Sequence, residues 1–157
     1  MARFLFLSSL LLLSSASVSA APASSASAFA AEAPTIVRDR AAMARLLGNE
    51  GITLQWIDWD RRGELDARMP GATLYLEGSQ RAASGPGLLT LSGRVTEVDA
   101  DRFRFHGRIV ITGTPDAGRQ CVRDGDFTFA ITQNRRYWRL QEMERCDGLT
   151  DYVDIYF

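Results

Sequence analysis

The 157-residue chain contains no lysine, a single histidine and two cysteines. Its 18 basic residues, all arginine, are balanced by 19 acidic residues, so the formal net charge at pH 7 is −1. Because so small a net charge creates no long-range field, we do not expect nucleic acid as a partner. A metal site needs several His, Cys or carboxylate ligands at fixed spacing, which a lone histidine does not supply. We therefore expect no metal and no cofactor.

The sequence also lacks a continuous apolar run of the about 20 residues that a membrane-spanning helix needs. The apolar run Phe4–Leu13 is short, follows Arg3 and precedes the small residues Val18–Ala20. This order is typical of a secretory signal peptide with its cleavage site, so we predict export to the periplasm or to the outside of the cell. The predicted organisation is a signal peptide (1–20), a flexible Ala/Ser/Pro-rich leader (21–34) and a single disulfide-bonded β-domain (35–157).

The two cysteines lie in the stretch RQCVRDGDFTFAITQNRRYWRLQEMERC, residues 119–146, which has the pattern of a β-hairpin. A turn at Gln133-Asn134 suits this pattern, because Asn tolerates the left-handed conformation of a tight turn. In that register the facing pairs are Phe129–Trp138, Phe127–Leu140, Arg123–Glu144 and Cys121–Cys146. Directly opposed residues have Cβ atoms close enough for a disulfide. Since two cysteines in an exported chain more often form a structural bridge than a redox or metal site, we predict a Cys121–Cys146 disulfide.

The rest of the pattern predicts one helix followed by strands. Thr35–Leu47 has apolar residues at helical spacing and is followed by Gly48, which predicts an amphipathic helix. Besides the two arms of the cysteine hairpin, the predicted strands are Ile52–Trp59, Ala72–Gly78, Leu88–Val98, Arg102–Thr112 and Asp151–Phe157. About seven strands, joined mostly by hairpins, must roll up or stack to bury their apolar faces. The predicted fold class is therefore mainly β, a small antiparallel β-barrel or bent sandwich with one N-terminal amphipathic helix.

A pair of glycines favours the barrel over the sandwich. Strands Leu88–Val98 and Arg102–Thr112 form a hairpin in which Val95 faces Phe105 and Gly93 faces Gly107. Opposed glycines in mid-strand mark a sharp bend or a close approach of two backbones. A small barrel uses such a bend where its sheet turns a corner.

The other face of this hairpin carries the candidate ligand-binding residues. The register places four arginines and the only histidine there: Arg94, Arg102, Arg104, His106 and Arg108. Guanidinium groups projecting together from rigid strands predict a site for an anion, such as a phosphate, a sugar acid or a carboxylate of a partner protein. The alternative is a solvated face whose arginines pair with acids on neighbouring strands.

Aromatic residues provide a second candidate surface. Trp56 and Trp59, with polar residues between and beside them, predict a platform for a carbohydrate or a partner protein. The alternative is that both tryptophans belong to the core. Tyr137, Tyr152 and Tyr156 fall on polar-facing positions and also indicate a contact surface.

These features predict a non-enzymatic binding or envelope-accessory module, with an anionic ligand, a glycan or an envelope protein as candidate partner. One alternative is an integral outer-membrane β-barrel, because the C-terminal alternation of Val153, Ile155 and Phe157 resembles the last strand of such proteins. The odd strand count and the short first and last strands weigh against it. A second alternative is a hydrolase that uses loop carboxylates such as Asp58 and Glu77 as acid and base.

Overall fold

The computed structural model describes residues 32–157, which form one compact unit. The predicted signal peptide and the first part of the predicted leader, residues 21–31, lie outside the described residues. Strands dominate the described unit, so the prediction of a mainly β fold is confirmed. Between residues 32 and 157, no helix is both long and apolar enough to cross a membrane.

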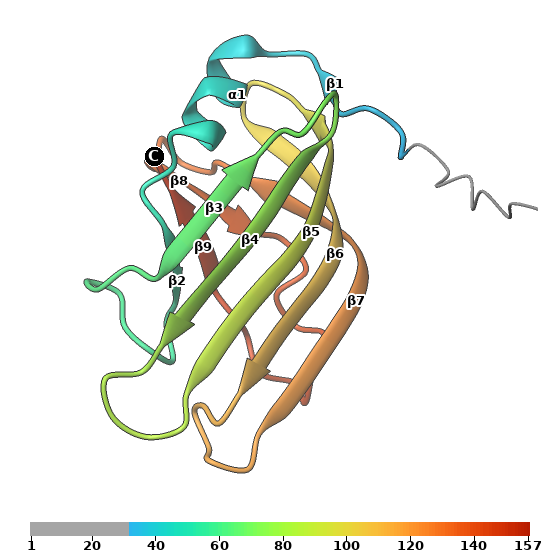
Figure 1. Cartoon of the computed structure of the whole chain (residues 1–157). Coiled ribbons are helices and arrows are strands. Elements are labelled where there is room, and N and C mark those ends of the chain that lie inside the picture. Colours follow the sequence, from blue (N-terminus) through green and yellow to red (C-terminus); the bar gives the residue numbers. More distant parts are fainter. Residues whose placement is uncertain (1–31) are drawn as a thin grey trace, which may run out of the picture. The chain divides into compact units, whose positions relative to one another are not determined.

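The described chain contains one short helix and nine strands (Figure 1). Their order is β1 (Ile36–Val37), α1 (Arg40–Leu47), β2 (Ile52–Leu54), β3 (Glu64–Arg68), β4 (Leu74–Arg81), β5 (Leu88–Val98), β6 (Arg102–Thr112), β7 (Gln120–Ala130), β8 (Tyr137–Leu140) and β9 (Val153–Tyr156).

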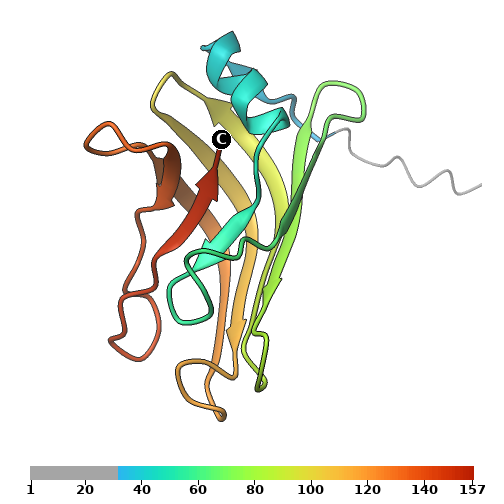
Figure 2. The same ribbon diagram turned by 90° about the vertical axis from the view of Figure 1, so that its left-hand side faces the viewer.

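Eight of these strands, β2 to β9, form a nearly closed antiparallel barrel, as the glycine pair predicted. Each strand from β3 to β9 pairs with the next, β2 pairs with β9, and a bridge between Ile52 and Gly63 joins β2 to the start of β3. The eighth strand is β3, which the sequence analysis missed because its ELDAR pattern has little apolar character. Figures 1 and 2 show α1 lying across one end of the barrel.

The helix is shorter than predicted. It begins at Arg40 rather than Thr35, because the carboxylate of Asp39 caps it by accepting the Ala42 N–H at 2.7 Å. Ahead of this cap, β1 pairs in parallel with β5, as suits its two β-branched residues. Thr35 is buried, and its hydroxyl donates to the Val95 carbonyl at 2.7 Å. The predicted end of the helix at Gly48 is confirmed.

The barrel interior is filled by apolar side chains from alternate positions of the strands. The largest of them are aromatic and have almost no exposed surface: Trp138, Phe103, Phe105 and Phe129. The Phe103 and Phe129 rings are stacked with centroids 4.9 Å apart, and the Trp138 ring meets Phe103 edge-on at 5.6 Å. Such interlocking rings stabilise the core beyond the burial of their area.

A row of three glycines crosses the barrel wall where β5, β6 and β7 lie side by side. The predicted pair Gly93–Gly107 is confirmed, and Gly125 of β7 faces Gly107 from the other side. A Cβ at Gly107 would lie 2.6 Å from the ring of Phe105 and 2.8 Å from the Cα of Gly93. The ring of Phe105 therefore fills the space that side chains would otherwise occupy.

The predicted β5–β6 register is correct except at one end. A bulge at Thr96 places Glu97, not Thr96, opposite Arg104. Without the bulge, the predicted register would place the Thr96 hydroxyl opposite Arg104, whereas the bulge puts the Glu97 carboxylate there. The bulge thus changes the chemistry of the outer face.

The cysteine hairpin has the predicted turn and disulfide but a different register. Gln133 and Asn134 both have positive φ, 56° and 58°, and Cys121 is bonded to Cys146 with their Cα atoms 5.8 Å apart. The observed pairs are Phe129–Leu140 and Ala130–Arg139, so β8 is shifted by two residues. A two-residue shift keeps every side chain on its predicted face, because side chains alternate with a period of two.

The shift has one further consequence, because it removes the predicted Arg123–Glu144 pair. The strand β8 ends at Leu140, and the chain continues to Cys146 without strand structure. Arg123 instead contacts Asp151 and the Glu142 carbonyl.

Ahead of the start of β3, the side chain of Gln80 links β4 to the end of β2 and to the turn that follows it. The strand β2 ends at Leu54, not at Trp59 as predicted, and the chain then turns away from the sheet. Buried Gln80 of β4 accepts the Leu54 N–H at 2.6 Å and donates to the carbonyls of Asp58 and Arg61 at 2.9 and 2.8 Å. Its amide thus satisfies main-chain groups that a longer strand would have paired.

Candidate functional site

The predicted arginine and histidine face lies on the outer surface of β5 and β6, as expected. Most of its cationic groups face an acid. The His106 Nδ1 atom lies 2.8 Å from Asp126, and Arg108 makes two hydrogen bonds with Asp124 at 2.7 and 3.1 Å. Both acids belong to β7, the neighbouring strand.

The other arginines of this face are also close to carboxylates. Arg104 lies 3.5 Å from Glu97 and Arg102 lies 3.1 Å from Asp101. For Arg94, the described residues provide no ion pair. Exposed pairs of this kind contribute little to stability, and they leave few free donors for an anion. The alternative of a solvated, paired face fits this geometry, while ligand binding here stays a prediction.

Trp56 is about one-third exposed and has a structural role at the end of the barrel. Its indole N–H donates to a carboxylate oxygen of Asp151 at 3.0 Å, and its carbonyl accepts from the Thr114 hydroxyl at 2.8 Å. These contacts tie the turn after β2 to the segment that enters β9 and to the loop between β6 and β7. Trp56 is therefore neither a core residue nor a free platform.

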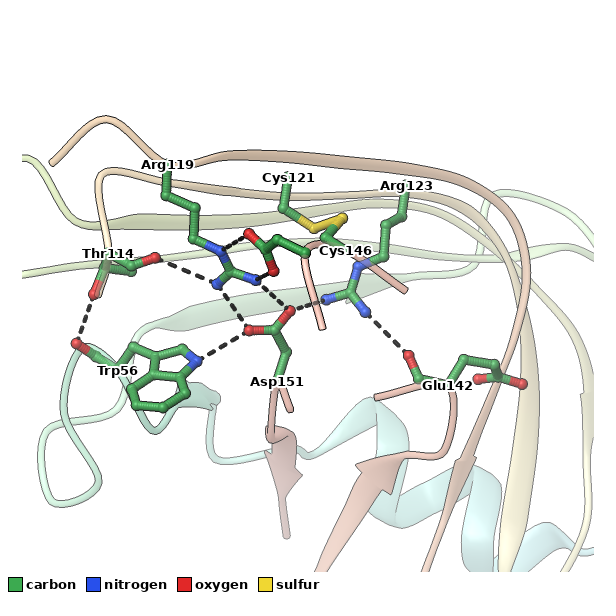
Figure 3. Close-up of a disulfide and its surroundings, with 9 residues drawn as sticks. Trp56, Thr114, Arg119, Cys121, Arg123, Glu142, Cys146 and Asp151 are labelled. Carbon is green, nitrogen blue, oxygen red and sulfur yellow. Dashed lines mark hydrogen bonds and ion pairs between the residues drawn. A yellow bond between two sulfur atoms is a disulfide. The ribbon is translucent and has the colours of Figure 1, made fainter. Parts of the chain in front are cut away.

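The carboxylate that Trp56 contacts is the centre of a buried ion cluster (Figure 3). Asp151 has no exposed surface and accepts two hydrogen bonds from Arg119, both at 2.9 Å, and one from Arg123 at 3.3 Å. Figure 3 shows Arg119, which immediately precedes β7, and Arg123 of β7 extending on either side of Cys121 toward Asp151. The cluster thus joins β7 to the segment that enters β9.

Burial and charge act in opposite directions within this cluster. The hydrogen bonds that Arg119 donates to Asp151 raise the pKa of Arg119 above its usual value, and the Asp147 carboxylate contributes to the same shift. Burial lowers the pKa of Arg123, although Asp151 partly opposes this effect. Because Arg119, Arg123 and Asp151 have almost no contact with solvent, they suit a structural role better than a reactive one. Within residues 32–157, no three His, Cys, Asp or Glu side chains are grouped as a metal site requires.

The most exposed aromatic residue of the predicted set is Trp59, whose surface is 43% accessible. Its ring lies 6.4 Å from that of Tyr152, and the guanidinium of Arg139 lies 5.6 Å from Trp59 and 4.2 Å from Tyr152. Arg139 also lies over Tyr137 at 5.2 Å. One arginine is therefore placed among three aromatic rings, each within reach of a cation–π contact.

The same arrangement continues along the outer face of β8 and β9. Tyr137 and Tyr156 face each other across the two strands with ring centroids 5.2 Å apart, and Arg62 lies over Tyr156 at 4.2 Å. We refer to this surface as the aromatic–arginine ladder. Its members are Trp59, Arg62, Tyr137, Arg139, Tyr152 and Tyr156.

A buried acid holds the centre of the ladder in place. Asp154 of β9 has no exposed surface and binds Arg139 through two hydrogen bonds at 2.7 and 2.6 Å. Burial raises the pKa of Asp154, while the guanidinium opposes that shift. The two-point contact fixes the plane of Arg139 and with it the rings stacked on that plane.

The ladder brings together residues that sequence reasoning only partly identified. The three tyrosines and Trp59 were predicted as contact residues, whereas Arg62, Arg139 and Asp154 were missed. The alternation in YWR (137–139) places Tyr137 and Arg139 on one face of β8, and the alternation in DYVDIY (151–156) does the same for Tyr152, Asp154 and Tyr156 of β9. Which of these residues contact each other follows only from the β8–β9 register. The acids proposed for a hydrolase are engaged elsewhere: Asp58 accepts the N–H groups of its own turn, and Glu77 contacts Arg68.

Comparisons with known proteins agree on one relationship. The chain is 36% identical, over 115 residues, to the uncharacterized protein PM1083 of Pasteurella multocida (strain Pm70), covering 72% of this chain and 74% of that protein. No solved structure matches. The model of the PM1083 family matches residues 34–157, which include the whole barrel. The chain therefore belongs to the PM1083 family.

Proposed function

We propose that this chain is an exported, non-enzymatic binding module that contacts a partner protein through the aromatic–arginine ladder. The observation that carries the proposal is the clustering of three aromatic rings, one exposed and two half-buried, around Arg139, which Asp154 holds rigidly. Trp, Tyr and Arg are the residues most enriched at the energetic centres of protein interfaces. Rings that are already ordered also lose little conformational freedom when a partner binds.

The packed interior supports a surface role for the barrel. An eight-stranded barrel is wide enough either to be filled by its own side chains or to hold one small ligand. Here Trp138, Phe103, Phe105 and Phe129 occupy the interior. The outer surface is therefore the better candidate for recognition.

Export is supported by the disulfide. Disulfides persist in oxidising compartments outside the cytoplasm, and the Cys121–Cys146 bond is consistent with such a location. The charged outer face of β5 to β7 favours strands that meet water over the alternative of a barrel embedded in lipid, whose outer face would be apolar.

Site-specific crosslinking in the source cell tests the proposal. We would place a photoreactive phenylalanine derivative at Trp59 or at Tyr156, and at Arg104 on the β6 face as the matched control. We expect one and the same protein to be captured from both ladder positions and not from the control position. Capture from Arg104 alone would move the function to the arginine and histidine face, and capture of glycan alone would make the partner a carbohydrate.

Affinity for the captured protein then measures the contribution of the ladder. The double variant Trp59→Ala/Tyr152→Ala should weaken binding at least tenfold, because each ring is placed as an interface anchor. The control Arg102→Ala/Arg104→Ala, on exposed residues, should bind as the wild type does. Equal affinities for the two variants would contradict the proposal.

A further inference from the structure

The strand β7 has a long edge without a neighbouring strand. All 11 of its residues pair with β6, whereas β8 pairs only with Phe129 and Ala130. Figures 1 and 2 show β7 continuing far beyond the end of β8, while the chain after β8 runs on as a loop. The part of β7 from Gln120 to Asp126 therefore has a strand on one side only.

The alternation of hydrogen bonds identifies the main-chain groups on this edge. Thr128 uses both of its main-chain groups on the β8 side, since its carbonyl accepts the Gln141 N–H at 2.8 Å and its N–H donates to Glu142 at 2.9 Å. Successive residues of a strand point their N–H and C=O groups to opposite sides. The main-chain groups of Asp126, Asp124 and Val122 thus point to the same side of β7 as those of Thr128. No described residue of the chain is hydrogen-bonded to them there.

The loop after β8 passes this edge without covering its main chain. Between Gln120 and Asp126, its contacts with β7 involve the β7 side chains, namely the Cys121–Cys146 bond and the hydrogen bond from Arg123 to the Glu142 carbonyl at 3.0 Å. The outward-facing residues Val122, Asp124 and Asp126 are all exposed to solvent along this stretch. The edge is both unpaired and accessible.

The side chains of the edge indicate what would bind there. Asp126 has 89% of its side chain exposed and Asp124 has 57%, and the apolar Val122 beside them is 54% exposed. Asp124 already pairs with Arg108 and Asp126 with His106 on the β6 side, but both carboxylates stay largely exposed. A basic residue on an added strand would reach each acid from the other side, where opposite charges on neighbouring strands attract. A second copy of the chain, paired through the same edge, would instead bring acids opposite acids.

We propose that the β7 edge, residues 120–126, binds an extended segment of a partner protein that carries basic residues at alternate positions. The segment would add a strand to the barrel wall, with its main chain bonded to Val122, Asp124 and Asp126. Its basic side chains would lie beside Asp124 and Asp126. This surface is separate from the ladder, so the inference does not depend on the proposed function.

The probe for this edge is a synthetic eight-residue peptide that alternates arginine with threonine or valine. In the free protein, the amide hydrogens of Val122, Asp124 and Asp126 should exchange much faster than those of Cys121 and Arg123, which face β6. Saturating peptide should slow the three edge amides at least tenfold. Edge amides that exchange as slowly as their β6-bonded neighbours in the free protein would overturn the proposal.

Methylation of the peptide's backbone amides distinguishes binding by strand addition from binding by charge attraction alone. Methyl groups on the amides that face β7 should abolish binding, whereas methyl groups on the alternate amides should leave it unchanged. The variant Asp124→Asn/Asp126→Asn, which keeps every main-chain donor, should weaken binding at least fivefold. Equal binding of both methylated peptides, no binding of the parent peptide, or dimerisation of the protein through this edge would each refute the inference.

Discussion

At the scale of single residues, the most consequential group is the carboxylate of Asp151. It is fully buried and is contacted by Arg119, Arg123 and Trp56, which come from two distant parts of the chain. A buried charge of this kind is stable only while its partners remain, because water cannot replace them. Asp151 therefore controls whether the segment entering β9 stays attached to β7.

Replacing this carboxylate should be strongly destabilising. We expect Asp151→Asn to lower the free energy of unfolding by about 3–5 kcal/mol, because Arg123 would then be buried without a counter-charge. Urea denaturation followed by tryptophan fluorescence measures this loss. Asp116→Asn, on an exposed loop residue, is the control and should change little. A loss for Asp151→Asn no larger than that of the control would show that the cluster does not hold the fold together.

The acid at the rim of the same cluster gives a prediction for pH dependence. The Arg119 hydrogen bond lowers the pKa of Asp147, so the folded protein binds this proton less tightly than the unfolded chain does. The ionised Asp147 carboxylate therefore stabilises the folded protein fully above the pKa of the unfolded chain, about 4, and this stabilisation is lost as the pH falls through the pKa of the folded protein. Thermal unfolding between pH 7 and 2 should show Asp147→Asn less stable than the wild type near neutrality and equal to it in acid. A difference that stays constant over this range would exclude the linkage.

At the scale of elements, the three long strands β5, β6 and β7 depend on the glycine row. The inward side of Gly107 is filled by the ring of Phe105, and the backbone of Gly93 lies directly beside it. A side chain there would force neighbouring strands apart, because tightly packed interiors do not yield to an added methyl group. The row allows the barrel wall to bend without leaving a cavity.

A single methyl group tests this role. We expect Gly107→Ala to destabilise the fold by at least about 2 kcal/mol, since neither a backbone nor an aromatic ring can move aside easily. Gly118→Ala is the matched control, because a Cβ there would meet nothing described within 4 Å and its φ is not positive. Parallel urea titrations compare the two variants. If both had the same stability, the close approach at Gly107 would not limit the packing.

At the scale of the whole molecule, the disulfide joins the long β7 strand to the loop that carries the chain toward β9. It closes a separation of 25 residues, which restricts the unfolded chain. The apolar core of the barrel is continuous without this bond, since the inward side chains of the hairpin, such as Phe129 and Trp138, are already buried in it. The disulfide should therefore add stability to a fold that forms without it.

We expect the double variant Cys121→Ser/Cys146→Ser to lose about 3–4 kcal/mol of stability and to keep its circular dichroism spectrum and its export. Reduction of the wild-type protein under the same conditions should cause the same loss, which controls for the two substitutions. Mass analysis of the exported protein without reductant checks the bond itself. Two free thiols would contradict it.

The sequence by itself determined the parts of this protein that depend on local alternation. The β5–β6 register, the turn at Gln133-Asn134 and the faces of the strands follow from a period of two and from turn chemistry. The disulfide follows from the presence of two cysteines in a chain with a predicted signal peptide. The two-residue shift of β8 escaped prediction because it leaves the faces unchanged. The early start of the predicted helix was wrong because Thr35 is held by the barrel rather than by its neighbours in the chain.

Only the tertiary structure decided which charges meet. Trp56 and Asp151 are 95 residues apart in the chain, and Arg119 and Asp151 are 32 apart. Which residues pair at such separations depends on how the barrel closes, and the local sequence pattern does not predict that closure. The same holds for the ladder, because Trp59 reaches Arg139 only after β2 has paired with β9. The local pattern thus specified the strands, while closure of the barrel created both the buried cluster and the candidate contact surface.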